Sequence, residues 1–253
     1  MIKLLSWINY LSVVIGVMNF LSLIIITSIV LKRNVKEKLN WLFASSFFFL
    51  AIAYVFLPIG AFVYTQENPA AMLILTEIYG FCLSLGIILL MLSSIAFNYG
   101  TRFIFKWFIL LPAITLAAFI GILLFVMNAI KAVQGSETPD IQTTMLFTAI
   151  YYPICAVLAV IIYIFLGRAY KHTQDTNIRK CLKFFIVGLS VSLTMLIPNI
   201  LSNILADIWD QAQILNGMEY ILVTIGITLM LVGFLIRPVG EQRTEEVYQV
   251  AVS

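Results

Sequence analysis

Long apolar runs separated by short polar breaks dominate the pattern of this chain. A helix that crosses the hydrocarbon core of a bilayer needs about 20 apolar residues, each adding about 1.5 Å. Seven runs are long enough, and they cover residues 4–31, 39–65, 70–97, 104–130, 143–166, 181–206 and 214–236. They lack the alternation of apolar and polar positions that is typical of a transmembrane β-strand. The pattern therefore predicts an all-α, polytopic membrane protein with seven transmembrane helices.

The composition agrees with this prediction and excludes a soluble protein. Hydrophobic residues make up 62% of the 253 residues, whereas charged residues make up only 11%. A soluble domain carries about a quarter charged residues, so this chain has too few to cover an aqueous surface. We expect one seven-helix transmembrane domain over residues 1–236 and a short cytoplasmic tail over residues 237–253.

Lysine and arginine residues fall almost entirely on one side of the predicted membrane. Alternate breaks lie on alternate sides, and one side keeps only Lys3 and Lys131. The other side collects Lys32, Arg33, Lys36, Lys38, Arg102, Lys106, Arg168, Lys171, Arg179, Lys180, Lys183, Arg237 and Arg243. The positive-inside rule then predicts a multi-pass protein of the cell membrane with its N-terminus outside and its C-terminus in the cytoplasm. This asymmetry explains the basic residues through topology and lipid contact, so we expect no nucleic-acid partner.

Few residues of this chain could support catalysis. The single histidine, His172, lies in a basic break, and Cys82, Cys155 and Cys181 lie in or beside apolar runs without forming a CxxC motif. Haem ligation or a zinc centre within the membrane needs several histidines or a cluster of carboxylates. We therefore expect no metal, no cofactor and no enzymatic activity.

Two carboxylates interrupt the outer parts of apolar runs. An acidic side chain inside a span is costly unless it is paired, neutral or facing water, so Glu77 and Glu219 are candidate functional residues. Structural pairing of Glu77, and contact of Glu219 with outer water, are the alternative interpretations. Other polar residues fall at similar depth, which gives a predicted ligand site of Glu77, Tyr79, Tyr151, Tyr152, Asn199, Asn203, Glu219 and Tyr220. In this site the carboxylates would accept a cationic or hydrogen-bond-donating group, the tyrosines would stack on it, and the asparagines would orient it.

A weak internal repeat relates the first three runs to the last three. Pro58 precedes Gly86 by 28 residues, and Pro198 precedes Gly226 by the same distance. Such a repeat predicts two triplets of helices joined by the fourth span, an arrangement found in secondary transporters. A cation-coupled solute carrier is therefore one alternative function, and a structural subunit of a larger membrane complex is another.

The order of spans and basic loops resembles the seven-helix sensory regions that precede prokaryotic histidine kinases. The residues that carry this resemblance are the basic loop 31–41, the polar loop 168–183 and Pro198 late in the sixth run. The resemblance implies a sensor or receptor-like protein that binds an unknown small ligand outside and signals to a protein partner at the cytoplasmic loops. It does not imply kinase activity, because no kinase domain follows the seventh run in this chain.

Overall fold

The computed structural model describes residues 2–33, 35–63, 70–127, 129–132, 141–205 and 213–236. Its long helices confirm the predicted fold class: in this part of the chain, seven helices are long and apolar enough to cross a membrane. The helices are α1 (Ile2–Arg33), α2 (Lys38–Val63), α3 (Ala70–Tyr99), α4 (Thr101–Ile104), α5 (Trp107–Phe125), α6 (Met145–His172), α7 (Thr176–Leu193), α8 (Leu196–Leu205) and α9 (Gln213–Ile236).

Three segments differ in detail from the sequence prediction. The predicted loop 167–180 is mostly helical, because α6 continues to His172 and the Asp175 side chain caps the start of α7. The Asp175 carboxylate accepts hydrogen bonds from the backbone amides of Asn177 and Ile178, at 2.7 and 3.1 Å. Between α5 and α6, β1 (Ile130–Ala132) pairs antiparallel with β2 (Ile141–Thr143), with Lys131 opposite Gln142.

The sixth run forms two helices, α7 and α8, separated by a turn at Thr194 and Met195. Pro198 explains this break, because proline has no amide hydrogen to donate to the carbonyl of Thr194 four residues earlier. The amide of Ile197 donates to that carbonyl instead, at 3.1 Å, and the Thr194 hydroxyl donates to the carbonyl of Val191 at 2.6 Å. The sixth span is therefore continuous up to its middle and changes course there.

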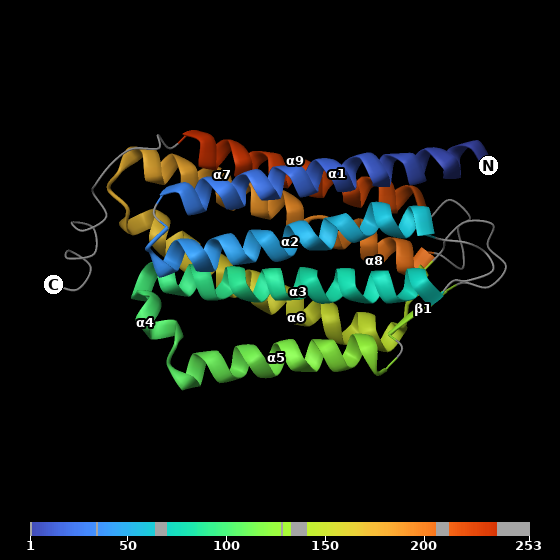
Figure 1. The fold of residues 1–253 in the computed structure, drawn as a ribbon, viewed down its shortest axis with the longest axis horizontal. Helices are drawn as coiled ribbons and strands as arrows, with labels where there is room; N and C mark the ends of the chain where they lie inside the picture. The colour runs from blue at the N-terminus through green and yellow to red at the C-terminus, as the bar shows by residue number, and fades with distance from the viewer. Residues whose placement is uncertain are drawn as a thin grey trace.

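Six of the spans form a ring, and the remaining span lies outside it. Around the ring, neighbours pack in the order α1, α2, α3, α6, α7 and α9, and α9 returns to α1. Helix α8 extends α7 and packs on α9, whereas α5 packs against α3 on the outside of the ring (Figure 1). Consecutive spans along the chain run in opposite directions, as short connections require, so α3 and α6 are parallel neighbours in the ring, as are α9 and α1.

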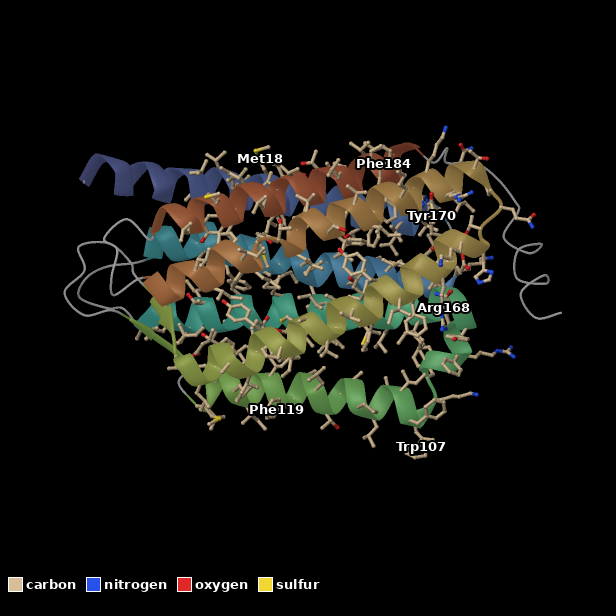
Figure 2. The ribbon with its side chains drawn as sticks, turned by 180° about the vertical axis from the view of Figure 1, so that it is seen from behind. Met18, Trp107, Phe119, Arg168, Tyr170 and Phe184 are labelled. Carbon is tan, nitrogen blue, oxygen red and sulfur yellow. The ribbon has the colours of Figure 1, made fainter. Side chains whose placement is uncertain are left out.

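Basic side chains gather at one end of this ring, which we call the basic end. Helix α1 finishes there with Lys32 and Arg33, and α6 finishes there with Lys171 and His172. Figure 2 shows nitrogen atoms concentrated around Arg168 and Tyr170 at this end. The segregation predicted from the sequence is thus present in the fold, and we call the other end of the ring the far end.

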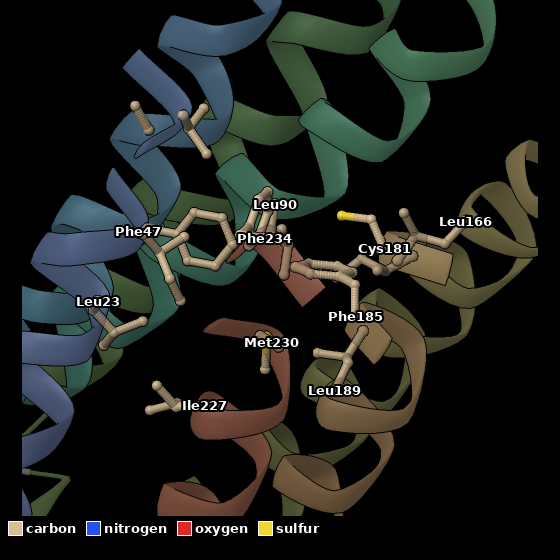
Figure 3. Packing of buried hydrophobic residues seen from close by; sticks show 14 of the residues in the cluster. Leu23, Phe47, Leu90, Leu166, Cys181, Phe185, Leu189, Ile227, Met230 and Phe234 are labelled. Carbon is tan, nitrogen blue, oxygen red and sulfur yellow. The ribbon is translucent and has the colours of Figure 1, made fainter. Parts of the chain in front are cut away.

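Apolar side chains fill the ring interior towards the basic end. Three phenylalanines, Phe47 of α2, Phe185 of α7 and Phe234 of α9, contact one another edge to face, with ring centroids 5.7–6.0 Å apart. Their rings meet at the centre of the cluster, with Leu23, Met230 and other apolar side chains around them (Figure 3). We call these three residues the phenylalanine seal.

Candidate ligand site

Side chains from four helices lie within electrostatic range of one another towards the far end of the ring interior. The Glu219 carboxylate of α9 interacts electrostatically with the side chains of Tyr54 in α2, Tyr79 in α3 and Tyr152 in α6, and with its neighbour Tyr220. Helices α9 and α3 lie opposite each other in the ring, so the interaction between Glu219 and Tyr79 crosses the interior. These five residues, together with Tyr151, form what we call the tyrosine–glutamate cluster.

The helical period explains why these side chains point inward. In α2, Phe47, Ala51 and Tyr54 are spaced at three and four residues and are all buried. In α9, the buried residues Val223, Ile227, Met230 and Phe234 have the same spacing, and Glu219 lies four residues before Val223. The inward face of each helix therefore carries phenylalanine near the basic end and polar aromatic or acidic residues towards the far end.

Aromatic contacts and one hydrogen bond order part of the cluster. The rings of Tyr54 and Tyr79 pack edge to face, with centroids 6.2 Å apart and planes inclined by 75°. Tyr151 stacks on Phe147 at 4.8 Å, and its hydroxyl shares a 3.0 Å hydrogen bond with the Ser84 hydroxyl of α3. Tyr151 thus ties α6 to α3, and its neighbour Tyr152 remains half-buried.

The structure brings together five of the eight residues predicted for the site, namely Tyr79, Tyr151, Tyr152, Glu219 and Tyr220. It does not join Glu77 to this cluster. Glu77 is half-buried and precedes Tyr79 by two positions, which places the two side chains about 200° apart around α3. Asn199 and Asn203 belong to α8, and their side chains lie outside the described residues.

Two further polar residues were not predicted as part of a site. Tyr54 is only 4% exposed, and the spacing from Phe47 and Ala51 could have indicated its inward direction. Asn19 of α1 is 1% exposed, and neither atom of its amide group has a hydrogen-bond partner within the described residues. The sequence shows Asn19 on the same face as Ser12 and Gly16, a pattern that indicates helix packing.

The cluster offers one carboxylate among several aromatic rings and hydroxyl groups. A negative charge with aromatic faces nearby suits a cation that carries apolar groups, because such a cation gains both Coulomb attraction and cation–π contact. The tyrosine hydroxyls can also accept hydrogen bonds from an amine. The chemistry of these residues therefore favours an ammonium group over an anion.

Comparison with known proteins adds no relative from which to transfer a function: no protein-family model and no curated protein matches the chain. The candidate site therefore depends on the residues of this chain alone.

Proposed function

We propose that this protein is a membrane receptor or sensor that binds a small organic ammonium ion at the tyrosine–glutamate cluster. The observation that carries the proposal is the position of Glu219, which lies inside a membrane-spanning helix and interacts with tyrosines from three other helices. A bound ammonium ion would place an opposite charge next to this carboxylate within the span.

The orientation of the proposed receptor follows from its charges. The basic end lies in the cytoplasm under the positive-inside rule, so the cluster is nearer to the outer surface. The phenylalanine seal lies between the cluster and the cytoplasmic side, where three large rings exclude water from the ring interior. The seal would leave the cluster accessible from the outer side only, as a sensor requires.

Helix α9 provides a route from the site to the cytoplasmic side. It carries Glu219 in the cluster, and Phe234 in the seal. The Arg33 guanidinium of α1 donates a 2.7 Å hydrogen bond to the carbonyl of Phe234 and lies 5.3 Å from the centre of its ring. A shift of α9 on ligand binding would therefore move a basic group at the end where a protein partner docks.

The proposal is tested by titrating tetramethylammonium into purified protein in lipid nanodiscs. We expect saturable binding that weakens at least about tenfold in Glu219→Gln, because the variant keeps the shape of the side chain and loses its charge. Glu77→Gln is the matched control. It also removes one carboxylate near the far end, but from a face of α3 that points away from the cluster. Equal affinity of Glu219→Gln and wild type, or the absence of binding to wild type, would overturn the proposal.

A second candidate function, a cation-coupled carrier, is favoured by the way the two triplets pack. Gly86 and Gly226 are 140 positions apart. A Cβ atom on Gly86 would lie 2.6 Å from Cγ of Leu50, and one on Gly226 would lie 2.5 Å from the carbonyl oxygen of Gly188. In both triplets a glycine at the same position of the third span thus packs closely on the second span.

The two triplets also differ. Helix α1 packs along α2 much more extensively than its counterpart α6 packs along α7, and α2 is continuous where α7 and α8 are separated. Alternating access would require both ends of the ring to open in turn. A carrier predicts uptake of labelled tetramethylammonium into proteoliposomes, whereas a receptor predicts binding with no uptake above protein-free liposomes.

A further inference from the structure

Among the described residues, the wall of the ring is least packed between α6 and the α7–α8 span. These helices are consecutive in the chain, and residues 173–175 join them at the basic end. Contacts between their side chains begin there, with the Arg179 guanidinium 4.7 Å from the centre of the Tyr170 ring. Further from the basic end, the Tyr163 hydroxyl donates a 2.8 Å hydrogen bond to the Ser190 hydroxyl. Beyond this bond α6 and α7 diverge, and α8 packs on α9 without comparable packing on α6 (Figure 2).

The faces that meet at Tyr163 and Ser190 become exposed towards the far end. On α6, Ala156 lies within about 20° of Tyr163 around the helix axis, and it is exposed although it is small. On the other side, Thr194 is exposed, and Ile197 at the start of α8 is 61% exposed. Packed helices would bury these positions, so the two helices present unpartnered faces to the bilayer here.

The tyrosine–glutamate cluster lies directly behind this divergence. In the ring, the α7–α8 span stands between α6 and α9. Glu219 lies on the inward face of α9, four residues before the buried Val223, and within electrostatic range of Tyr152 of α6. Tyr152 lies about 20° from Tyr163 around α6, on the side of the helix that faces the divergence. The residues proposed to bind the ammonium group are therefore next to the least packed part of the wall.

The break between α7 and α8 allows α8 to shift while α7 stays in place. The turn at Thr194 and Met195 interrupts the helical hydrogen bonding between them. Among the described elements, α8 packs substantially on α9 alone. The free energy of local opening is smaller for a segment that packs on few neighbours than for one that packs on several.

We propose that the ligand enters laterally from the outer leaflet, between α6 and α8, and that it is a single-chain amphiphile with an ammonium head group. This inference rests on the proposed function of the cluster and specifies its ligand. The head group lies against Glu219 and the tyrosines, while the alkyl chain stays among the exposed apolar residues Ile197 and Leu201 of α8. Charge complementarity selects the head group, and the bilayer that surrounds the divergence supplies the chain with an apolar medium.

The test compares dodecyltrimethylammonium with tetramethylammonium, which has the same head group and no chain, in nanodiscs of uncharged lipid. Ala156→Trp places a large ring in the divergence, and Ala118→Trp places the same ring on the exposed surface of α5 as a matched control. We expect Ala156→Trp to slow association of dodecyltrimethylammonium at least about tenfold, and Ala118→Trp to change it less than about twofold. Because all variants share the same lipid, partition of the amphiphile into the bilayer cancels in this comparison.

The outcomes of this test distinguish the lateral entry route from the binding site at the cluster. Unchanged association of dodecyltrimethylammonium with Ala156→Trp would overturn lateral entry, while tetramethylammonium binding that depends on Glu219 would leave the site in place. Failure of both probes to bind the wild-type protein would overturn the proposed function as well. If Ala156→Trp does not fold, Ala156→Leu is the smaller substitution, and we expect it to slow association in the same direction. Unchanged association with that variant would likewise contradict lateral entry.

Discussion

The two halves of the ring interior are built on the same helix faces and differ in chemistry. Helix α2 contributes Phe47 to one half and Tyr54 to the other, two turns away on the same face. Helix α9 contributes Phe234 to the first half and Glu219 to the second. The first half is closed by aromatic rings in contact, whereas the second places a carboxylate among tyrosines. A continuous scaffold thus carries the seal in one half and the proposed binding site in the other through the choice of side chains along one stripe.

The two halves also contribute differently to stability. Phenylalanine rings in edge-to-face contact stabilise the fold and leave no polar atom to satisfy. A carboxylate in a span raises the free energy of the folded protein unless something compensates its charge. The contrast matches a structural role for the seal and the binding role proposed for the cluster.

Removing a ring from the seal has the largest expected effect on stability. Phe47 is fully buried, so Phe47→Ala should lower the free energy of unfolding by about 3–5 kcal/mol through lost packing and a new cavity. Phe119→Ala is the control, because Phe119 is 41% exposed on α5, and its loss should cost much less. Reversible unfolding in mixed micelles measures both values. Similar losses for the two variants would contradict the existence of a specifically packed seal.

A methyl group at the closest helix crossing should have the next largest effect. Gly226 lies on α9 between the cluster and the seal, and its neighbour across the crossing is Gly188 of α7. Gly226→Ala must push the two backbones apart, which we expect to cost about 1–3 kcal/mol of unfolding free energy. Gly167→Ala is the control, since nothing lies within 4 Å of a Cβ atom there. If both variants unfold like wild type, the two backbones are not in contact.

Breaking the hydrogen bond between α6 and α3 should have the smallest effect. Tyr151→Phe keeps the stacking on Phe147 and removes the hydroxyl that meets Ser84, at a cost of about 1 kcal/mol or less. A double-mutant cycle with Ser84→Ala isolates this interaction from other effects of each change. A coupling free energy indistinguishable from zero would show that Tyr151 is held by packing alone.

The amino-acid sequence predicts the spans well and their neighbours poorly. Helices α3 and α5 both appear as apolar runs, yet 61% of the α3 span is buried inside the protein, against 22% of the α5 span. Lipid and protein interior are both apolar, so hydropathy cannot distinguish a central helix from one that faces lipid. The ring order and the outer position of α5 therefore emerge only from the structure.

The sequence predicts how deep in the membrane the residues of the candidate site lie, but it predicts less well which side of each helix faces the ring interior. The sequence places Tyr79, Tyr152 and Glu219 in the outer third of their spans, because depth follows from position along an apolar run. Glu77 has a similar depth but points away from Tyr79, and only the rotation of α3 decides which of them faces the ring. Tyr54 was missed because a single buried tyrosine within an apolar run resembles ordinary packing.

The rate of cysteine modification at two depths of α9 tests the contrast between the halves most directly. Tyr220→Cys and Ile227→Cys lie on nearly the same face, two turns apart, and are compared after replacement of the three native cysteines. A membrane-impermeant thiol reagent with a trimethylammonium group is applied from outside to intact cells. The account predicts rapid modification at position 220 and none at position 227. Equal rates at the two positions, or no reaction at position 220, would contradict an outward-facing ammonium site above a closed seal.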